Sequence, residues 1–206
     1  MTGSERREQL IGIGRALFAA KGVEGTTVEE IAAQAEVSKP VVYEHFGGKE
    51  GLYAVVVDRE IASLLGAITH SLSGRGSPRT LLERATIALL DYIEGSTDGF
   101  RILVRDSPVA QSTGSFASLI SDIAGQVEYL LVDAFAARGF APQMASMYAQ
   151  MLVGMVAMTG QWWLDTREPA KEEVAAHLVN LAWNGLTGLE RHPALSVRAR
   201  PSRVTP

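Results

Sequence analysis

The side chains with the clearest chemical use lie in residues 38–46, a short segment for which the sequence predicts a helix. Val42 and Phe46 can be buried on one side of it. The residues left facing outward are Ser38, Lys39, Val41, Tyr43 and Glu44. Hydroxyl and ammonium groups can donate to phosphate oxygens, and a carboxylate can accept from the amino group of cytosine. A helix with this outward face could enter the major groove of double-stranded DNA.

Other chemistries have little support. The four histidines, His45, His70, His177 and His192, are too scattered to bind a metal ion together, and the chain has no cysteine. Nucleophile-elbow, Walker and Rossmann motifs are missing. We therefore expect no catalytic residue, no metal and no cofactor. An enzyme on a helical scaffold remains an alternative, and its turnover would have to survive deletion of residues 1–48.

Three short helices must position the outward face. The first ends near Gly22, and the second begins after Thr27, a good N-cap with acidic residues behind it. Ala32 is small enough for the third helix to cross the second, and Val37 is an apolar plug for the turn between them. Gly47 and Gly48 then end the third helix. This arrangement is a helix-turn-helix.

The rest of the chain also shows helical periodicity, with no period-two strand. We expect an all-α protein of about nine helices. A three-helix helix-turn-helix domain would cover residues 1–48, a larger ligand-binding and dimerisation domain residues 49–190, and a disordered tail residues 191–206. The fourth helix, starting at Lys49, would belong to both domains and serve as the lever between them.

The first quarter of the chain closely resembles the N-terminal domain of the TetR family of transcriptional regulators. The similarity is carried by Thr27-Val-Glu-Glu-Ile-Ala-Ala-Gln-Ala-Glu-Val-Ser-Lys-Pro-Val-Val-Tyr-Glu-His-Phe-Gly-Gly-Lys-Glu-Gly-Leu-Tyr53 and by Ala16-Leu-Phe-Ala-Ala-Lys-Gly22. The resemblance implies a repressor that binds a palindromic DNA operator as a homodimer and is released by a small apolar or amphipathic effector.

The resemblance also implies a role for individual residues. Thr27 would cap its helix and touch a phosphate, Tyr43 and His45 would approach the DNA backbone, and Lys49 would bind a phosphate. Arg6 and Arg7 could add an N-terminal arm. The full predicted DNA-binding set is Thr27, Ser38, Lys39, Pro40, Val41, Tyr43, Glu44, His45 and Lys49.

Three residues depart from the family pattern. Glu36 stands at a turn position where glycine is usual and a positive φ is expected, at a cost of about 1 kcal/mol. Val41 offers only an apolar contact, for example to a thymine methyl group. Glu44 either accepts from cytosine or points to solvent. A helical hairpin without a DNA role explains the apolar positions equally well, and a helical carrier of a lipophilic molecule is the corresponding alternative function.

A run of methionines and tryptophans after residue 143 could form an adaptable wall of a ligand pocket. Ordinary core packing explains it equally well. The predicted ligand contacts are Phe100, Arg105, Tyr129, Met151, Met155, Met158 and Trp162. Arg101 and Arg105 share a helical face and could instead pair with Asp98 or Asp106. Small residues on the last two helices predict a four-helix dimer interface, with close packing inside one subunit as the alternative. They are Ala149, Val153, Gly154, Ala157, Gly160, Ala175, Ala182 and Gly185.

Charge and composition set the remaining expectations. The net charge is −4, and residues 1–60 hold seven Lys/Arg against ten Asp/Glu, so DNA binding must depend on the placement of individual cations. The polar start lacks a signal-peptide core, and no uncharged apolar run reaches the length of a membrane span. We expect a cytoplasmic protein with no membrane partner.

Overall fold

The computed structural model describes residues 1–105, 116–191 and 193, and in these ranges the chain forms nine α-helices and no strand. The helices are α1 (Gly3–Lys21), α2 (Val28–Gln34), α3 (Lys39–Phe46), α4 (Lys49–Ser73), α5 (Pro78–Gly95), α6 (Thr97–Val104), α8 (Phe116–Ala137), α9 (Met144–Thr166) and α10 (Lys171–Thr187). The predicted all-α fold is therefore confirmed. Most of the predicted disordered tail lies outside the described residues.

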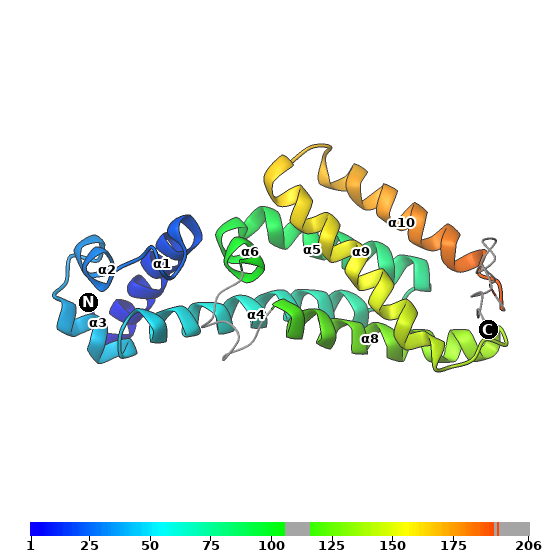
Figure 1. The fold of residues 1–206 in the computed structure, drawn as a ribbon, viewed down its shortest axis with the longest axis horizontal. Helices are drawn as coiled ribbons and strands as arrows, with labels where there is room; N and C mark the ends of the chain where they lie inside the picture. Colours follow the sequence, from blue (N-terminus) through cyan, green and yellow to red (C-terminus); the bar gives the residue numbers. More distant parts are fainter. Residues whose placement is uncertain (106–115, 192, 194–206) are drawn as a thin grey trace, which may run out of the picture.

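The molecule is elongated, and α4 connects its two ends (Figure 1). Helices α1–α3 gather around the first turns of α4, while α5 and α8 pack on its second half and α9 and α10 pack on those two helices in turn. Helix α6 lies between the two groups and contacts both α1 and α4. A single cluster of buried apolar side chains extends from Leu10 in α1 to Leu178 in α10. Because α4 belongs to both groups, a displacement in one group can be transmitted along it to the other.

Local signals in the sequence account for the helix-turn-helix. The Thr27 hydroxyl accepts from the backbone N–H of Glu30 at 3.1 Å, and the Glu30 carboxylate accepts from the N–H of Thr27 at 3.2 Å. Ala32 is buried, and Val37 packs against the core. The predicted N-cap is confirmed, and the burial of Ala32 and Val37 agrees with their expected packing.

Two turns around α3 use left-handed backbone. Glu36 has a φ of 55°, as its position in the turn predicts, although it carries a side chain. Gly47 ends α3 with a φ of 73°. The first turn of α4 also needs a glycine, because a Cβ on Gly51 would lie 1.9 Å from the carbonyl oxygen of Phe46. Helices α3 and α4 can approach closely only with glycine at this position.

Candidate nucleic-acid interface and apolar cavity

Helix α3 presents the polar face that the sequence predicts. Val42 is fully buried, whereas the Tyr43 side chain is 54% exposed. Ser38, Lys39, Pro40 and Glu44 are also exposed, and Val41 and His45 are half-buried. Thr27 is exposed at the start of α2. The arrangement leaves a phenol, a carboxylate and an ammonium group accessible on one short helix and its N-terminus.

Two of the cations in the predicted set already have partners. Lys39 forms an ion pair with Glu29 of α2, and its hydrogen bond and charge lower the pKa of the Glu29 carboxyl. The Lys49 ammonium donates to the carbonyl oxygens of Val23 (3.0 Å) and Thr26 (3.1 Å). Lys39 and Glu29 are both exposed, so a phosphate could replace the carboxylate at little cost. Lys49, by contrast, braces the loop before α2 and keeps one N–H for another acceptor.

The predicted N-terminal arm is not observed. Arg6 and Arg7 lie inside α1 and point at the other two helices. Arg6 donates to the carbonyl oxygen of Ala35 (3.2 Å), and Arg7 donates to that of His45 (2.9 Å). The Arg7 guanidinium also lies 4.4 Å from the ring centroid of Phe46. These arginines satisfy carbonyl groups at the ends of α2 and α3 and so fix α3 against α1.

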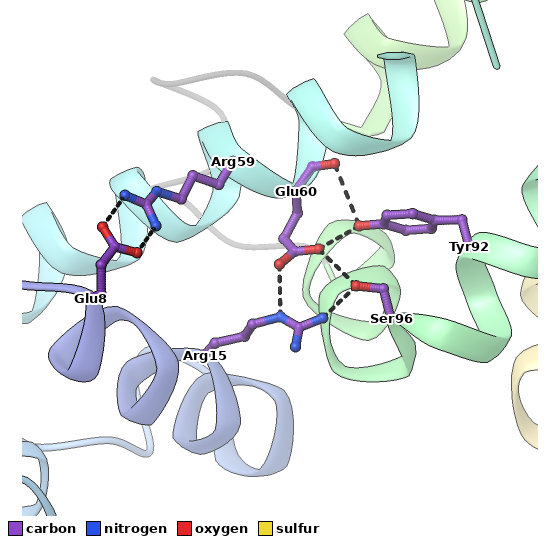
Figure 2. A network of polar contacts seen from close by, with 6 residues as sticks. All are labelled: Glu8, Arg15, Arg59, Glu60, Tyr92 and Ser96. Atoms are coloured by element: carbon purple, nitrogen blue, oxygen red, sulfur yellow. Dashed lines mark hydrogen bonds and ion pairs between the residues drawn. The ribbon is translucent and has the colours of Figure 1, made fainter. Parts of the chain in front are cut away.

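A buried carboxylate joins the helix-turn-helix group to the larger group (Figure 2). Glu60 of α4 is 9% exposed. It accepts from Arg15 of α1 (2.7 Å), from the Tyr92 hydroxyl of α5 (2.5 Å) and from the Ser96 hydroxyl (3.3 Å). Arg15 also donates to Ser96 at 2.5 Å. Burial and the neighbouring Glu60 carboxylate raise the pKa of Tyr92 far above its ordinary value, so the phenol remains a donor.

Further contacts hold the two groups of helices together at the same place, which we call the junction. Arg59 of α4 makes two hydrogen bonds to Glu8 of α1, at 2.5 and 2.7 Å. From the end of α6, Arg105 donates to the carbonyl oxygen of Phe18 at 3.0 Å. Arg105 is among the residues expected in a ligand pocket, and it lies instead against the C-terminal turn of α1. Its contact joins α6 directly to the helix-turn-helix group.

The larger group of helices encloses a cavity of about 250 Å³. Its wall combines side chains of α4, α5, α8, α9 and α10. The principal lining residues are Leu64, Ile68, Leu82, Leu89, Phe116, Leu119, Ile123, Val127, Leu131, Leu152, Val156 and Trp183. No charged residue lines this cavity among the described parts of the chain. The cavity can hold hydrocarbon, and a bare charge inside it would be strongly disfavoured.

None of the seven predicted ligand contacts lines this cavity. Phe100 is fully buried against other aromatic rings, and Met155 packs against the core. Tyr129, Met151, Met158 and Trp162 are 81%, 56%, 63% and 52% exposed. Arg101 pairs with Asp165 instead. The difference between the predicted contacts on α9 and the cavity lining is one of helical phase: α9 is apolar on two sides, and Leu152, Val153, Val156 and Ala157 line the cavity.

The small residues predicted to form a dimer interface are mostly buried within the subunit. Ala149, Val153, Ala157, Ala175 and Ala182 are buried, and a Cβ on Gly160 would lie 2.9 Å from Ile93. The alternative of close packing inside one subunit is therefore correct for these positions. The exposed large apolar residues of α9 instead recur on one side of the helix: Met147, Met151, Met158 and Trp162.

Two further classes of site find no support in the described ranges. No group of three or more His, Asp or Glu side chains is placed to hold a metal ion there. No helix in the same ranges is long and apolar enough to cross a membrane.

Comparison with known proteins defines the class that this geometry indicates. Residues 10–56 match the family model of bacterial regulatory proteins of the tetR family, and residues 78–185 match that of the tetracyclin repressor-like C-terminal domain. A DNA-binding transcriptional regulator is the class that both matches define. The chain belongs to the TetR family.

Individual relatives match between about half and most of the chain. It is 28% identical to the HTH-type transcriptional activator FasR of Mycolicibacterium smegmatis, over 89% of this chain and 84% of that protein. It is 29% identical to the HTH-type transcriptional repressor KstR2 of Rhodococcus jostii, over 45% of this chain and 46% of that one. A TetR-like regulator from Rhodococcus sp. RHA1 superposes with a TM-score of 0.74, at 27% identity, over 89% of this chain and 97% of that structure.

The junction yields a direct prediction about Gly99 of α6. A Cβ at this position would lie 1.9 Å from Oε2 of Glu60 and 2.9 Å from Arg15. We expect Gly99→Ala to displace the buried carboxylate from its partners and to lower the free energy of unfolding by about 1–3 kcal/mol. Urea denaturation measures the change.

Gly66→Ala is the matched control. Gly66 also lies in a helix, and a Cβ there would meet no described heavy atom within 4 Å. This substitution should raise stability by up to about 1 kcal/mol through helix propensity alone. Equal behaviour of the two variants would contradict the tight contact at Glu60.

Proposed function

We propose that this protein is a ligand-responsive repressor that binds a palindromic operator as a homodimer and is released when an apolar or amphipathic effector enters the cavity. The exposed polar face of α3 carries the DNA-binding part of the proposal. The proposed contacts are Thr27, Ser38, Lys39, Pro40, Val41, Tyr43, Glu44, His45 and Lys49. Activation of transcription is a second candidate, because a relative that shares 28% identity is named an activator.

Dimerisation is proposed through the outer side of α9. Met147, Met151, Met158 and Trp162 are between 40% and 63% exposed, and Leu181 of α10 is 64% exposed. Large apolar side chains gathered on one helix face usually mark an interaction surface. Two copies of α9 and α10 would make a four-helix interface and hold two α3 helices at a fixed separation. Palindromic half-sites require a separation of about 34–36 Å or a multiple of it.

Release is proposed to act through the junction between the two groups of helices. The cavity wall includes α4 and α5, and the same helices supply Glu60 and Tyr92 of the buried network. An effector that shifts α4 would move α1, which is bonded to α4 through Arg15. Helix α6 would follow, because Arg105 bonds its C-terminal end to α1. The two α3 helices would then lose their spacing, and coupling of this kind is a free energy shared by both ligands.

The DNA-binding proposal predicts a specific loss for Tyr43→Phe. The substitution keeps the exposed ring and removes only the hydroxyl, so the fold should be unchanged. We expect affinity for the sequence upstream of the protein's own gene to fall at least about tenfold, because each subunit of the dimer loses one hydrogen bond to a charged phosphate. Electrophoretic mobility shift at fixed salt measures the effect.

The half-buried Tyr148 of α9 offers the matched control. Tyr148→Phe makes the same chemical change far from α3 and should leave operator affinity as in the parent. If Tyr43→Phe also binds like the parent, the proposed backbone contact is wrong. If no upstream DNA is bound specifically but the cavity still takes up a ligand, the carrier alternative is favoured.

The dimer proposal predicts that Trp162→Glu dissociates the protein. A carboxylate at this exposed apolar site would have to be desolvated on association, so the dissociation constant should rise by at least tenfold. Sedimentation velocity over a concentration series measures it. Gln150→Glu adds the same charge at an exposed position elsewhere on α9 and should remain dimeric. A Trp162→Glu protein that stays dimeric would exclude this face.

A further inference from the structure

A groove of about 450 Å³ lies between α4 and α8, directly beside the apolar cavity. Leu72 and Leu130 line both spaces, so these two side chains form the partition between them. The remaining residues of the groove are polar or small. They are Thr69, Ser73, Asp122, Gly125, Gln126 and Tyr129. The apolar cavity and the polar, solvent-accessible groove are thus separated by the side chains of Leu72 and Leu130.

We propose that the groove binds the head of the effector, and that this head is an uncharged hydrogen-bonding group such as an alcohol or an amide. The proposal rests on the proposed function, since it takes the cavity as the site of the effector's hydrocarbon part. The effector would then lie across the partition of Leu72 and Leu130, with its chain among the lining residues of α8 and α9.

The cavity itself requires the head to lie elsewhere. Its lining carries no charged side chain among the described residues, and Thr86 is its only hydroxyl-bearing residue in those ranges. Thr86 already donates to the carbonyl oxygen of Leu82 at 2.9 Å. A polar head left in this space would lose its hydration without gaining adequate partners. The adjoining groove offers both partners and water.

The groove presents donors and acceptors together. Tyr129 is 81% exposed and contributes a phenolic hydroxyl, while Asp122 contributes a carboxylate. Gln126 donates through Nε2 to the hydroxyl of Thr69 at 3.0 Å, so its amide oxygen is left to accept. A neutral head that both donates and accepts can use all three groups. A carboxylate or phosphate head would instead face Asp122, the only charged side chain that lines the groove in the described chain.

A competing position for an anionic head exists at the α4–α5 turn. Gly76 lines the cavity there, and Nη1 of Arg84 lies 3.7 Å from the place a Cβ on Gly76 would take. Arg84 already donates to the carbonyl oxygen of Arg75 at 3.0 Å and is exposed. This arginine does not line the cavity, whereas the groove shares the two lining side chains of Leu72 and Leu130 with it. The neutral head at the groove is therefore the better supported arrangement.

Binding of three probes to the full-length protein tests the proposal. Toluene reports on the cavity alone, 1-dodecanol adds a neutral head, and dodecanoate adds an anionic one. Fluorescence of Trp183, which lines the cavity, provides the signal, with Trp183→Phe as the blank. At pH 8 and low ionic strength we expect 1-dodecanol to bind at least about tenfold more tightly than dodecanoate, because the carboxylate must face Asp122.

Two variants assign the preference to the groove. Tyr129→Phe should weaken 1-dodecanol about fivefold, which corresponds to one hydrogen bond, and should leave toluene unchanged. Asp122→Asn should strengthen dodecanoate about threefold and leave toluene unchanged. Both side chains are exposed, so the fold should be unaffected, and circular dichroism checks this.

The outcomes separate this proposal from the proposed function. Tighter binding of dodecanoate than of 1-dodecanol, lost in Arg84→Ala, would overturn the neutral head and place an anion at the α4–α5 turn. Equal binding of 1-dodecanol to the parent and to Tyr129→Phe would remove the groove from the site. If toluene itself fails to bind, the cavity is not an effector site and the proposed function fails first.

Discussion

One buried carboxylate constrains how the two ends of this protein sit together. Glu60 lies at the middle of the junction, and it is acceptable there only because Arg15, Tyr92 and Ser96 supply donors from three directions. Removing one partner from a buried ion pair leaves an uncompensated charge, at a typical cost of about 3–5 kcal/mol. The network therefore favours a single arrangement of α1, α4 and α5. Any effector that displaces these helices must either break the hydrogen bonds of this network or move its members together.

Helix α3 likewise depends on contacts from neighbouring helices to hold it in place. Helix α3 has only eight residues, too few to be stable alone, and it buries a single side chain completely, that of Val42. Arg7 stabilises its C-terminal carbonyl and its Phe46 ring, and Gly51 lets α4 approach it. The cations near the outward face are already paired within the protein, Lys39 with Glu29 for example. In the proposed complex, exchange of such partners would let an acidic domain present positive groups to a phosphate without a high net charge.

Short-range features of this protein could be predicted from sequence, and long-range ones could not. The Thr27 cap, the positive φ of Glu36 and the outward face of α3 each depend on residues within one or two turns. The cavity depends on the phase of long helices that are apolar on two sides, so sequence reasoning places Met151 and Met158 in the pocket although both side chains are exposed. Glu60 and Arg105 act through partners that lie 32 and 87 positions away in the sequence, Tyr92 and Phe18 respectively. No local pattern marks such pairings, and the junction was missed for that reason.

In the proposed mechanism, filling the cavity changes the separation of the two α3 helices of a dimer. The chain has no cysteine, so Gln34→Cys at an exposed position of α2 gives one spin-label site per subunit. Double electron–electron resonance on the labelled dimer measures the distance between the two labels. Saturation with 1-dodecanol should shift that distance by several ångströms, while labels at Gln150→Cys on α9 should keep theirs. An unchanged distance between the Gln34 labels, with the cavity demonstrably filled, would contradict the account.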